Sequence, residues 1–258
     1  MYKLLIILII FLSPSIYAQS AEQKGFEIVK EADKRDTGWK DQKSILTMIL
    51  FNRQGQKSTR KMHNRSLEME NDGDKTMIIF DQPRDIKGTA FLTYTHSTRP
   101  DDQWLYLPAL KRVKRISSNN KSGPFMGSEF AYEDLASQEV DKYTYKYLRD
   151  EIVDDTDTFV IERFPTYKHS GYTKQIVYID KKIYQPIKVI FYDRKSTILK
   201  TLLFIEYHLH MEKYWRPTIM RMTNHQTGKS TDLIWNEIKF KNNFSESDFN
   251  KSSLKRAR

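Results

Sequence analysis

An alternation of apolar and polar residues with a period of two is the feature that most restricts the fold of this chain. From Ser44 onward, short runs of this kind are separated by turn sequences such as Asn71-Asp72-Gly73-Asp74. In the longest run, residues 198–210, the odd-numbered residues are mostly apolar, whereas Lys200, Glu206, His208 and His210 fall on the opposite face. One apolar face and one wet face predict a single curved antiparallel sheet.

About twelve strands carry this pattern, which predicts a mainly β (α+β) chain. The expected strands are residues 44–51, 58–70, 75–80, 89–96, 103–107, 140–148, 158–164, 173–179, 187–192, 198–210, 215–223 and 230–240. Two short helices are expected, Ala21 to Arg35 and a second near Ser128 to Ser137 with Ser128 as its cap. Asp150 to Asp157 is predicted to be an exposed hairpin loop. Because no linker or repeat divides the chain, residues 19–258 are expected to form a single domain.

The first eighteen residues are typical of a secretory signal peptide, cleaved near Ala18. Lys3 supplies a positive start, and Leu4 to Leu12 is an apolar run of about ten residues, shorter than the roughly twenty that a membrane-spanning helix needs. The chain contains no cysteine, so neither a disulfide nor a lipid-bearing thiol is available. These features predict a soluble protein of the periplasm.

The net charge is positive, with 43 Lys and Arg against 33 Asp and Glu, a difference of +10. Removal of Lys3 with the signal peptide lowers this charge by one. Export excludes nucleic acid as the expected partner and leaves anionic lipid, lipopolysaccharide or an acidic protein surface. A surplus of lysine can also serve solubility alone.

The residues favour no catalytic chemistry, and neither a metal nor a cofactor is expected. Without cysteine there is no thiol nucleophile, and no nucleophile elbow, zinc-protease pair or glycine-rich phosphate loop is present. His208 and His210 share a strand face and could form half a zinc site, but no third ligand has an obvious position, so two polar residues on a solvent-exposed face are the favoured interpretation. An exported hydrolase built on the many carboxylates is the remaining enzymatic alternative.

The stretch between Asp101 and Leu135 combines an aromatic strand, a cationic run and an aromatic loop. Phe, Tyr and Trp make up 13% of the chain, and ordinary core packing accounts for most of them. Six aromatic or Met residues flank this loop, however, and their apolar bodies suit a cavity for acyl chains. We expect these residues to line or gate its mouth: Trp104, Tyr106, Phe125, Met126, Phe130 and Tyr132.

The cationic run follows Pro108, where a strand tends to end or bulge. Arginine pairs bidentately with phosphate or carboxylate, so Arg112 and Arg115 are expected to meet a lipid headgroup or to latch onto Glu133 and Asp134. A solvated cationic edge that discourages aggregation is the alternative.

The same stretch resembles the periplasmic outer membrane lipoprotein-sorting family, the LolA/LolB-like carriers. The resemblance covers about thirty-five residues in three elements, Trp104 to Pro108, Lys111 to Ile116 and Gly127 to Leu135. It implies a strongly curved antiparallel sheet that forms an open half-barrel, capped by a few short helices, with a concave apolar face that binds acyl chains.

The sequence and the resemblance together predict a monomeric, non-enzymatic carrier of lipid or lipoprotein acyl chains for trafficking to the outer membrane. Transient membrane contact and an inner-membrane transporter as partner are expected. Replacement of Phe130 or Tyr132 by Asp is expected to abolish lipid retention and to leave the fold intact. The alternative is an accessory or sensor module of the same fold that docks on an envelope transporter or stress regulator.

Overall fold

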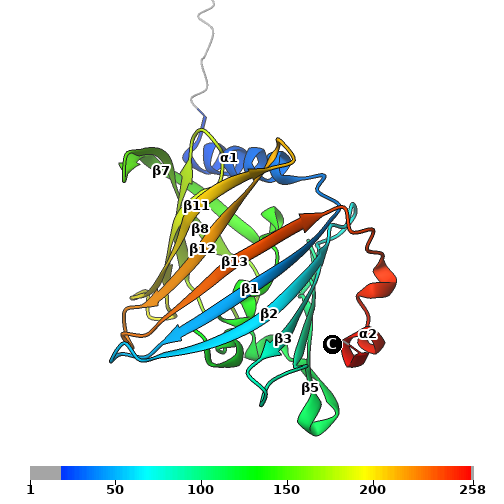
Figure 1. The fold of residues 1–258 in the computed structure, drawn as a ribbon. Helices are drawn as coiled ribbons and strands as arrows, with labels where there is room; N and C mark the ends of the chain where they lie inside the picture. Colours follow the sequence, from blue (N-terminus) through cyan, green and yellow to red (C-terminus); the bar gives the residue numbers. More distant parts are fainter. Residues whose placement is uncertain (1–18, 257–258) are drawn as a thin grey trace, which may run out of the picture.

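A single antiparallel sheet of thirteen strands forms the body of the protein. The computed structural model describes residues 19–256, and the expected signal peptide lies outside them. The strands follow the order β6-β5-β4-β3-β2-β1-β13-β12-β11-β10-β9-β8-β7 and bend into an open half-barrel (Figure 1). Since the two edge strands β6 and β7 do not pair, the sheet is not closed. The predicted fold class is confirmed.

The strands differ from the expected ones mainly at their ends. Their bounds are β1 Asp41–Phe51, β2 Lys57–Leu67, β3 Lys75–Gln82, β4 Ala90–Tyr94, β5 Asp102–Leu107, β6 Arg112–Ile116, β7 Tyr143–Val153, β8 Thr156–Pro165, β9 Lys174–Asp180, β10 Pro186–Tyr192, β11 Ile198–His210, β12 Tyr214–Asn224 and β13 Ser230–Phe240. The cationic run forms β6, an additional edge strand. The expected loop 150–157 was wrong in its extent, because β7 and β8 continue to a two-residue turn at Asp154 and Asp155, both with positive φ as a type I′ hairpin requires.

Two α-helices flank the sheet. α1 (Ala21–Asp36) is the predicted first helix, and the Ser20 side chain caps it by accepting from Gln23 N–H at 3.1 Å. α2 (Lys251–Arg256) follows β13 and packs on β4 and β5, on the outer side of the sheet (Figure 1). The helix expected near 128–137 was wrong. Only Tyr132–Leu135 forms a 3₁₀ turn, and the hydroxyl of Ser128 donates to Phe125 C=O at 2.7 Å instead of capping.

A long inner segment joins the two edge strands, and we call residues 117–142 the plug segment. It crosses the concave face: Phe125 packs against Phe80 and Phe91, with ring centroids 5.9 and 5.1 Å apart. On the opposite side, the backbone N–H of Glu129 donates to Thr231 of β13 at 3.0 Å. The plug segment therefore fills one part of the half-barrel with packed aromatic side chains.

The face assigned to the longest strand was partly wrong. On β11 the inward residues are Lys200, Leu202 and Phe204, while Leu203 on the outer face is 37% exposed. Glu206 has a φ of 56°, in the left-handed region, and beyond it Tyr207 faces the cavity. Before this irregularity the even-numbered residues face inward, and after it the odd-numbered Tyr207 does so.

Candidate functional site

The part of the concave face that the plug segment leaves unfilled is a cavity of about 820 Å³. This volume lies within the range of roughly 300–1,000 Å³ that is usual for sites that bury a small ligand. α1 covers one side through Val29 and Ala32, and the end of the plug segment borders it at residues 133–140. The cavity is thus enclosed by the sheet, one helix and one loop.

The deep wall of the cavity is apolar and is built by six neighbouring strands. On β9, β10 and β11 every second residue faces inward, as the strand period requires. The apolar lining residues are Ile161, Val177, Ile179, Val189, Phe191, Leu202, Phe204, Met220 and Trp235. Phe204 and Met220 are cross-strand partners of β11 and β12, and both remain partly exposed to the cavity. A chain of methylene groups would therefore contact hydrocarbon on this side.

Tyrosines add polar tips to this wall. The hydroxyl of Tyr207 donates to Pro186 C=O at 2.6 Å, and that of Tyr172 donates to Asp134 at 2.8 Å. Because these hydroxyls already have partners, their rings can present apolar faces to a ligand without leaving a buried donor unsatisfied.

The rim of the cavity is acidic. Nine carboxylates and two arginines belong to its lining. The carboxylates are Asp33, Asp36, Glu68, Glu70, Asp72, Asp74, Glu133, Asp134 and Glu139. One arginine, Arg216, is already paired with Asp36 at 2.6 Å, and the other, Arg163, is bonded to Gln175 at 2.7 Å. The rim therefore disfavours an anion.

Burial and the repulsion between neighbouring carboxylates raise the pKa of two rim residues, Glu139 and Asp74. Burial raises the pKa of Glu139 to about 7, and the charge of Asp74 adds to the shift. Burial likewise raises the pKa of Asp74 to about 6, although the Ser137 hydroxyl donates to it at 3.0 Å. Both groups therefore change charge near neutral pH, at the entrance of an apolar cavity.

α1 is held on β7 by close approach of the two backbones. A Cβ at Gly25 would lie 2.8 Å from the backbone nitrogen of Tyr147, which only glycine avoids. Lys24 lies over the Tyr147 ring at 3.5 Å, and this cation–π contact adds to the attachment. The missing side chain of Gly25 thus allows α1 to pack closely on β7.

The six residues predicted to form the mouth lie elsewhere in the structure. Trp104 and Tyr106 are on the outer face of β5, in the cluster with Phe249 beneath α2. Phe125 and Phe130 are 0% and 1% exposed inside the plug segment, where Met126 and Tyr132 pack against the same core. None of the six belongs to the lining of the 820 Å³ cavity within residues 19–256. An Asp at Phe130 is consequently expected to destabilise the fold.

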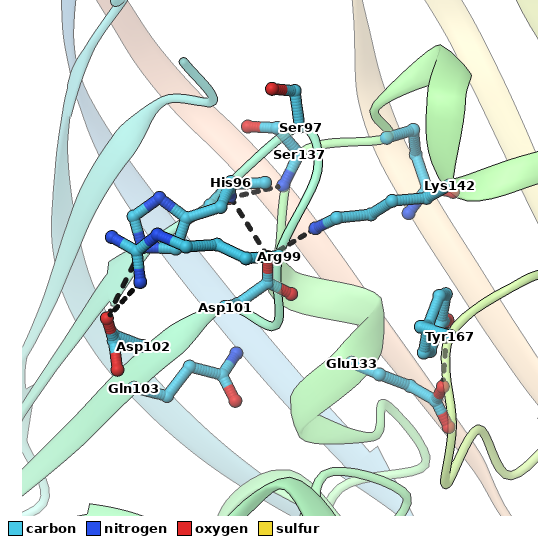
Figure 2. Close-up of polar contacts among 12 residues, drawn as sticks. His96, Ser97, Arg99, Asp101, Asp102, Gln103, Glu133, Ser137, Lys142 and Tyr167 are labelled. Atoms are coloured by element: carbon cyan, nitrogen blue, oxygen red, sulfur yellow. Dashed lines mark hydrogen bonds and ion pairs between the residues drawn. The ribbon is translucent and has the colours of Figure 1, made fainter.

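The cations and the acidic pair are also separated. Arg115 forms an ion pair with Asp102, and Arg112 lies exposed on the edge strand β6. Asp134 pairs with buried Lys200 of β11 at 2.6 Å, and Glu133 accepts from the Tyr167 hydroxyl at 3.0 Å (Figure 2). The structure brings Glu133 and Asp134 to the cavity, whereas it gives both arginines other surroundings.

Apart from Glu133 and Asp134, the residues that line the cavity were not identified from the sequence. Their signal is the alternation on residues 175–179 and 187–191, which predicted strands but not which face is concave. Within the described residues, no group of three or more His, Asp or Glu side chains is arranged to hold a metal ion. No helix among residues 19–256 is both long and apolar enough to cross a membrane.

Comparison with known proteins agrees with this architecture. A family model described as an uncharacterized protein matches residues 72–256. The chain is 58% identical to a domain from Vibrio parahaemolyticus named for outer membrane lipoprotein sorting, over 91% of this chain and all of that one, with a TM-score of 0.90. No curated protein matches the chain.

Two further crystal structures are similar. A DUF1329 family protein from Desulfovibrio piger is 29% identical, over 91% of this chain and 99% of that one, with a TM-score of 0.86. A LolA superfamily protein from Nitrosomonas europaea shares the fold at 20% identity, over 92% of this chain and all of that one, with a TM-score of 0.71. With the half-barrel and its apolar cavity, these matches show that the chain belongs to the LolA-like lipoprotein-sorting family.

Proposed function

We propose that the protein is a periplasmic carrier that shields a lipid, or the acyl chains of a lipoprotein, in the cavity between the sheet and α1. The apolar wall of the 820 Å³ cavity is the observation that carries this proposal. Each CH₂ group moved from water into such a wall contributes about 0.8 kcal/mol, so a chain can be held without any covalent chemistry. Residues 1–18 would direct export.

The proposed ligand residues are those of the deep wall, with Phe204, Met220 and Trp235 at its centre. α1 is the proposed cover. It packs chiefly on β7 at one edge of the half-barrel and is joined to β12 by the Asp36–Arg216 ion pair, whereas the plug segment contacts β4 and β13. Release of the ligand would require movement of α1 and would leave the plug segment in place.

The experiment compares two neighbouring substitutions on β11. Phe204→Glu places a charge in the cavity wall, whereas Leu203→Glu places the same charge on the outer face, where the side chain is 37% exposed. The chains are purified after periplasmic expression, their folding is checked by circular dichroism, and bound lipid is quantified by native mass spectrometry and solvent extraction.

We expect the parent and Leu203→Glu to carry about one equivalent of lipid and Phe204→Glu to lose most of it, because a carboxylate in an apolar wall costs several kcal/mol. Equal lipid in the two folded variants would contradict the assignment of the cavity. A parent that carries no lipid and takes up none from vesicles would favour the docking module instead.

A further inference from the structure

A second, smaller cavity of about 400 Å³ lies on the other side of the segment that borders the 820 Å³ cavity, which we call the acyl cavity after its proposed ligand. The two cavities share seven lining residues: Ser97, Glu133, Ala136, Ser137, Gln138, Tyr143 and Tyr167. The remaining walls come from the β4–β5 loop at 97–101, from the start of the plug segment and from the β8–β9 loop at 166–169. Four segments distant in sequence therefore meet around it.

Two buried lysines meet one carboxylate at this cavity (Figure 2 shows one of them, Lys142, against Asp101). Lys121 and Lys142 are 6% and 9% exposed. Lys142 forms an ion pair with Asp101, and Lys121 Nζ donates to Asp101 C=O at 2.6 Å and lies 3.6 Å from its carboxylate. Within residues 19–256, Asp101 is the single carboxylate that forms an ion pair with either ammonium.

The ion-paired group thus contains two ammonium groups and one carboxylate, while the charges of Asp102 and Glu139 act on it without forming an ion pair. A buried charge without a counterion is costly, and a ligand anion would remove that cost. Burial lowers the pKa of Lys121, and the neighbouring Lys142 acts in the same direction, whereas the charge of Asp101 opposes the shift.

Other groups at the cavity leave this excess in place. Glu133 accepts hydrogen bonds from Tyr167, Ser170 and Gly171, and burial raises its pKa. Asp141 is exposed at the edge, where exposed Lys168 and Arg99 also belong to the lining. The cavity holds four cations against three carboxylates, whereas the acyl cavity holds two against nine.

We propose that this smaller cavity binds a phosphate or carboxylate anion, with the Lys121 and Lys142 ammonium groups as its main donors and Lys168 at its edge. Three features carry the proposal: a partly open cavity of about 400 Å³, two nearly buried ammonium groups on one carboxylate, and an acidic rim that disfavours anions in the neighbouring cavity. The ion can be inorganic or can be the headgroup of an amphiphile.

The second possibility, that the anion is the headgroup of a bound amphiphile, rests on the proposed carrier function. An acidic amphiphile whose acyl chain lies along the apolar wall could place its anion across the shared residues 136–138, in the smaller cavity. The cargo would then be an acidic lipid, and the preference would come from the headgroup and not from the chain.

The test measures binding of inorganic phosphate by calorimetry, and of lysophosphatidic acid and monoacylglycerol with the same acyl chain by fluorescence displacement. Lys142→Met leaves Lys121 paired with Asp101 and so restores the balance of buried charge. Lys168→Gln changes an exposed side chain and serves as a second variant in case the first fails to fold. Lys114→Gln, which removes an exposed cation of β6 that lines neither cavity, is the matched control.

We expect phosphate binding to weaken about tenfold or more in Lys142→Met and up to about fivefold in Lys168→Gln, with no change in Lys114→Gln. A tighter complex with lysophosphatidic acid than with monoacylglycerol, abolished in the same variants, would identify the headgroup as the source. Phosphate binding with no such lipid preference would identify a free anion. Absence of phosphate binding, or equal binding by Lys142→Met, Lys168→Gln and parent, would overturn the proposal, while retained monoacylglycerol binding would still support the acyl cavity.

Discussion

Glu139 at the rim of the acyl cavity should make the protein less stable as the pH rises, and Glu139→Gln should remove this effect. Its Oε1 lies over Gly73, where an added Cβ would approach it to 2.7 Å, and burial beside Asp74 raises its pKa to about 7 from 4.5. In the unfolded chain the carboxyl ionises near its ordinary value. Between the two values the native state binds more protons than the unfolded state, so stability falls with rising pH.

The loss of folding stability that ionised Glu139 causes is complete above about pH 7 and absent below about pH 4. A pKa rise of this size corresponds to roughly 3 kcal/mol at about 1.4 kcal/mol per unit, and screening by water at the partly exposed rim reduces it to about 1–2 kcal/mol. The Glu139→Gln chain should therefore be more stable than the parent by about 1–2 kcal/mol at pH 8, a rise in Tm of roughly 2–8 °C. At pH 4 the two chains should be equally stable.

Urea unfolding followed by tryptophan fluorescence at the two pH values measures this difference. Asp155→Asn in the β7–β8 turn removes the same charge from an exposed position and should show no such pH-dependent gain. If the free energy of unfolding of Glu139→Gln exceeds that of the parent by as much at pH 4 as at pH 8, or does not exceed it at pH 8, burial does not disfavour the ionised carboxylate of Glu139. The raised pKa assigned to the rim would then be wrong.

Three further substitutions probe the cover, the plug segment and the outer face. Gly25→Ala should cost about 1–3 kcal/mol and speed lipid exchange, because the new Cβ pushes α1 from the backbone of Tyr147; chemical unfolding and a lipid-transfer assay measure both. Lys200→Met should cost about 3–5 kcal/mol in urea unfolding, because it leaves the carboxylate of Asp134 buried without its ion pair. Trp104→Ala should cost about 3–5 kcal/mol yet leave the extracted lipid unchanged, since this side chain packs beneath α2 on the outer face.

The class of fold could be predicted because it depends on a repeated signal. Alternation recurs in nearly every strand, and turn sequences separate the strands, so errors at single residues do not change the result. β6 was missed as a strand because its five residues carry three cations and only two apolar side chains, which is an edge-strand composition with no alternation of hydrophobicity to detect.

The cavity could not be placed because the face of a strand is a tertiary property. Residues Leu202 to Ile205 are apolar on both faces, so the period of two does not distinguish inward Phe204 from outward Leu203. The positive φ at Glu206 then reverses the alternation, and no residue type announces it. The local sequence thus predicted the strand, whereas the curvature of the whole sheet determines which side chains line the cavity.

Aromatic and charged residues are concentrated between residues 101 and 135. In the structure, many of these side chains pack inside the protein or form ion pairs. Phe125 and Phe130 fill the closed part of the half-barrel, and Lys200 with Asp134 fixes the plug segment to β11. The buried pair costs desolvation but gives the plug segment one defined position, which an apolar contact alone would specify less strictly. The plug segment thus fills one part of the half-barrel, and the cavity beneath α1 occupies another.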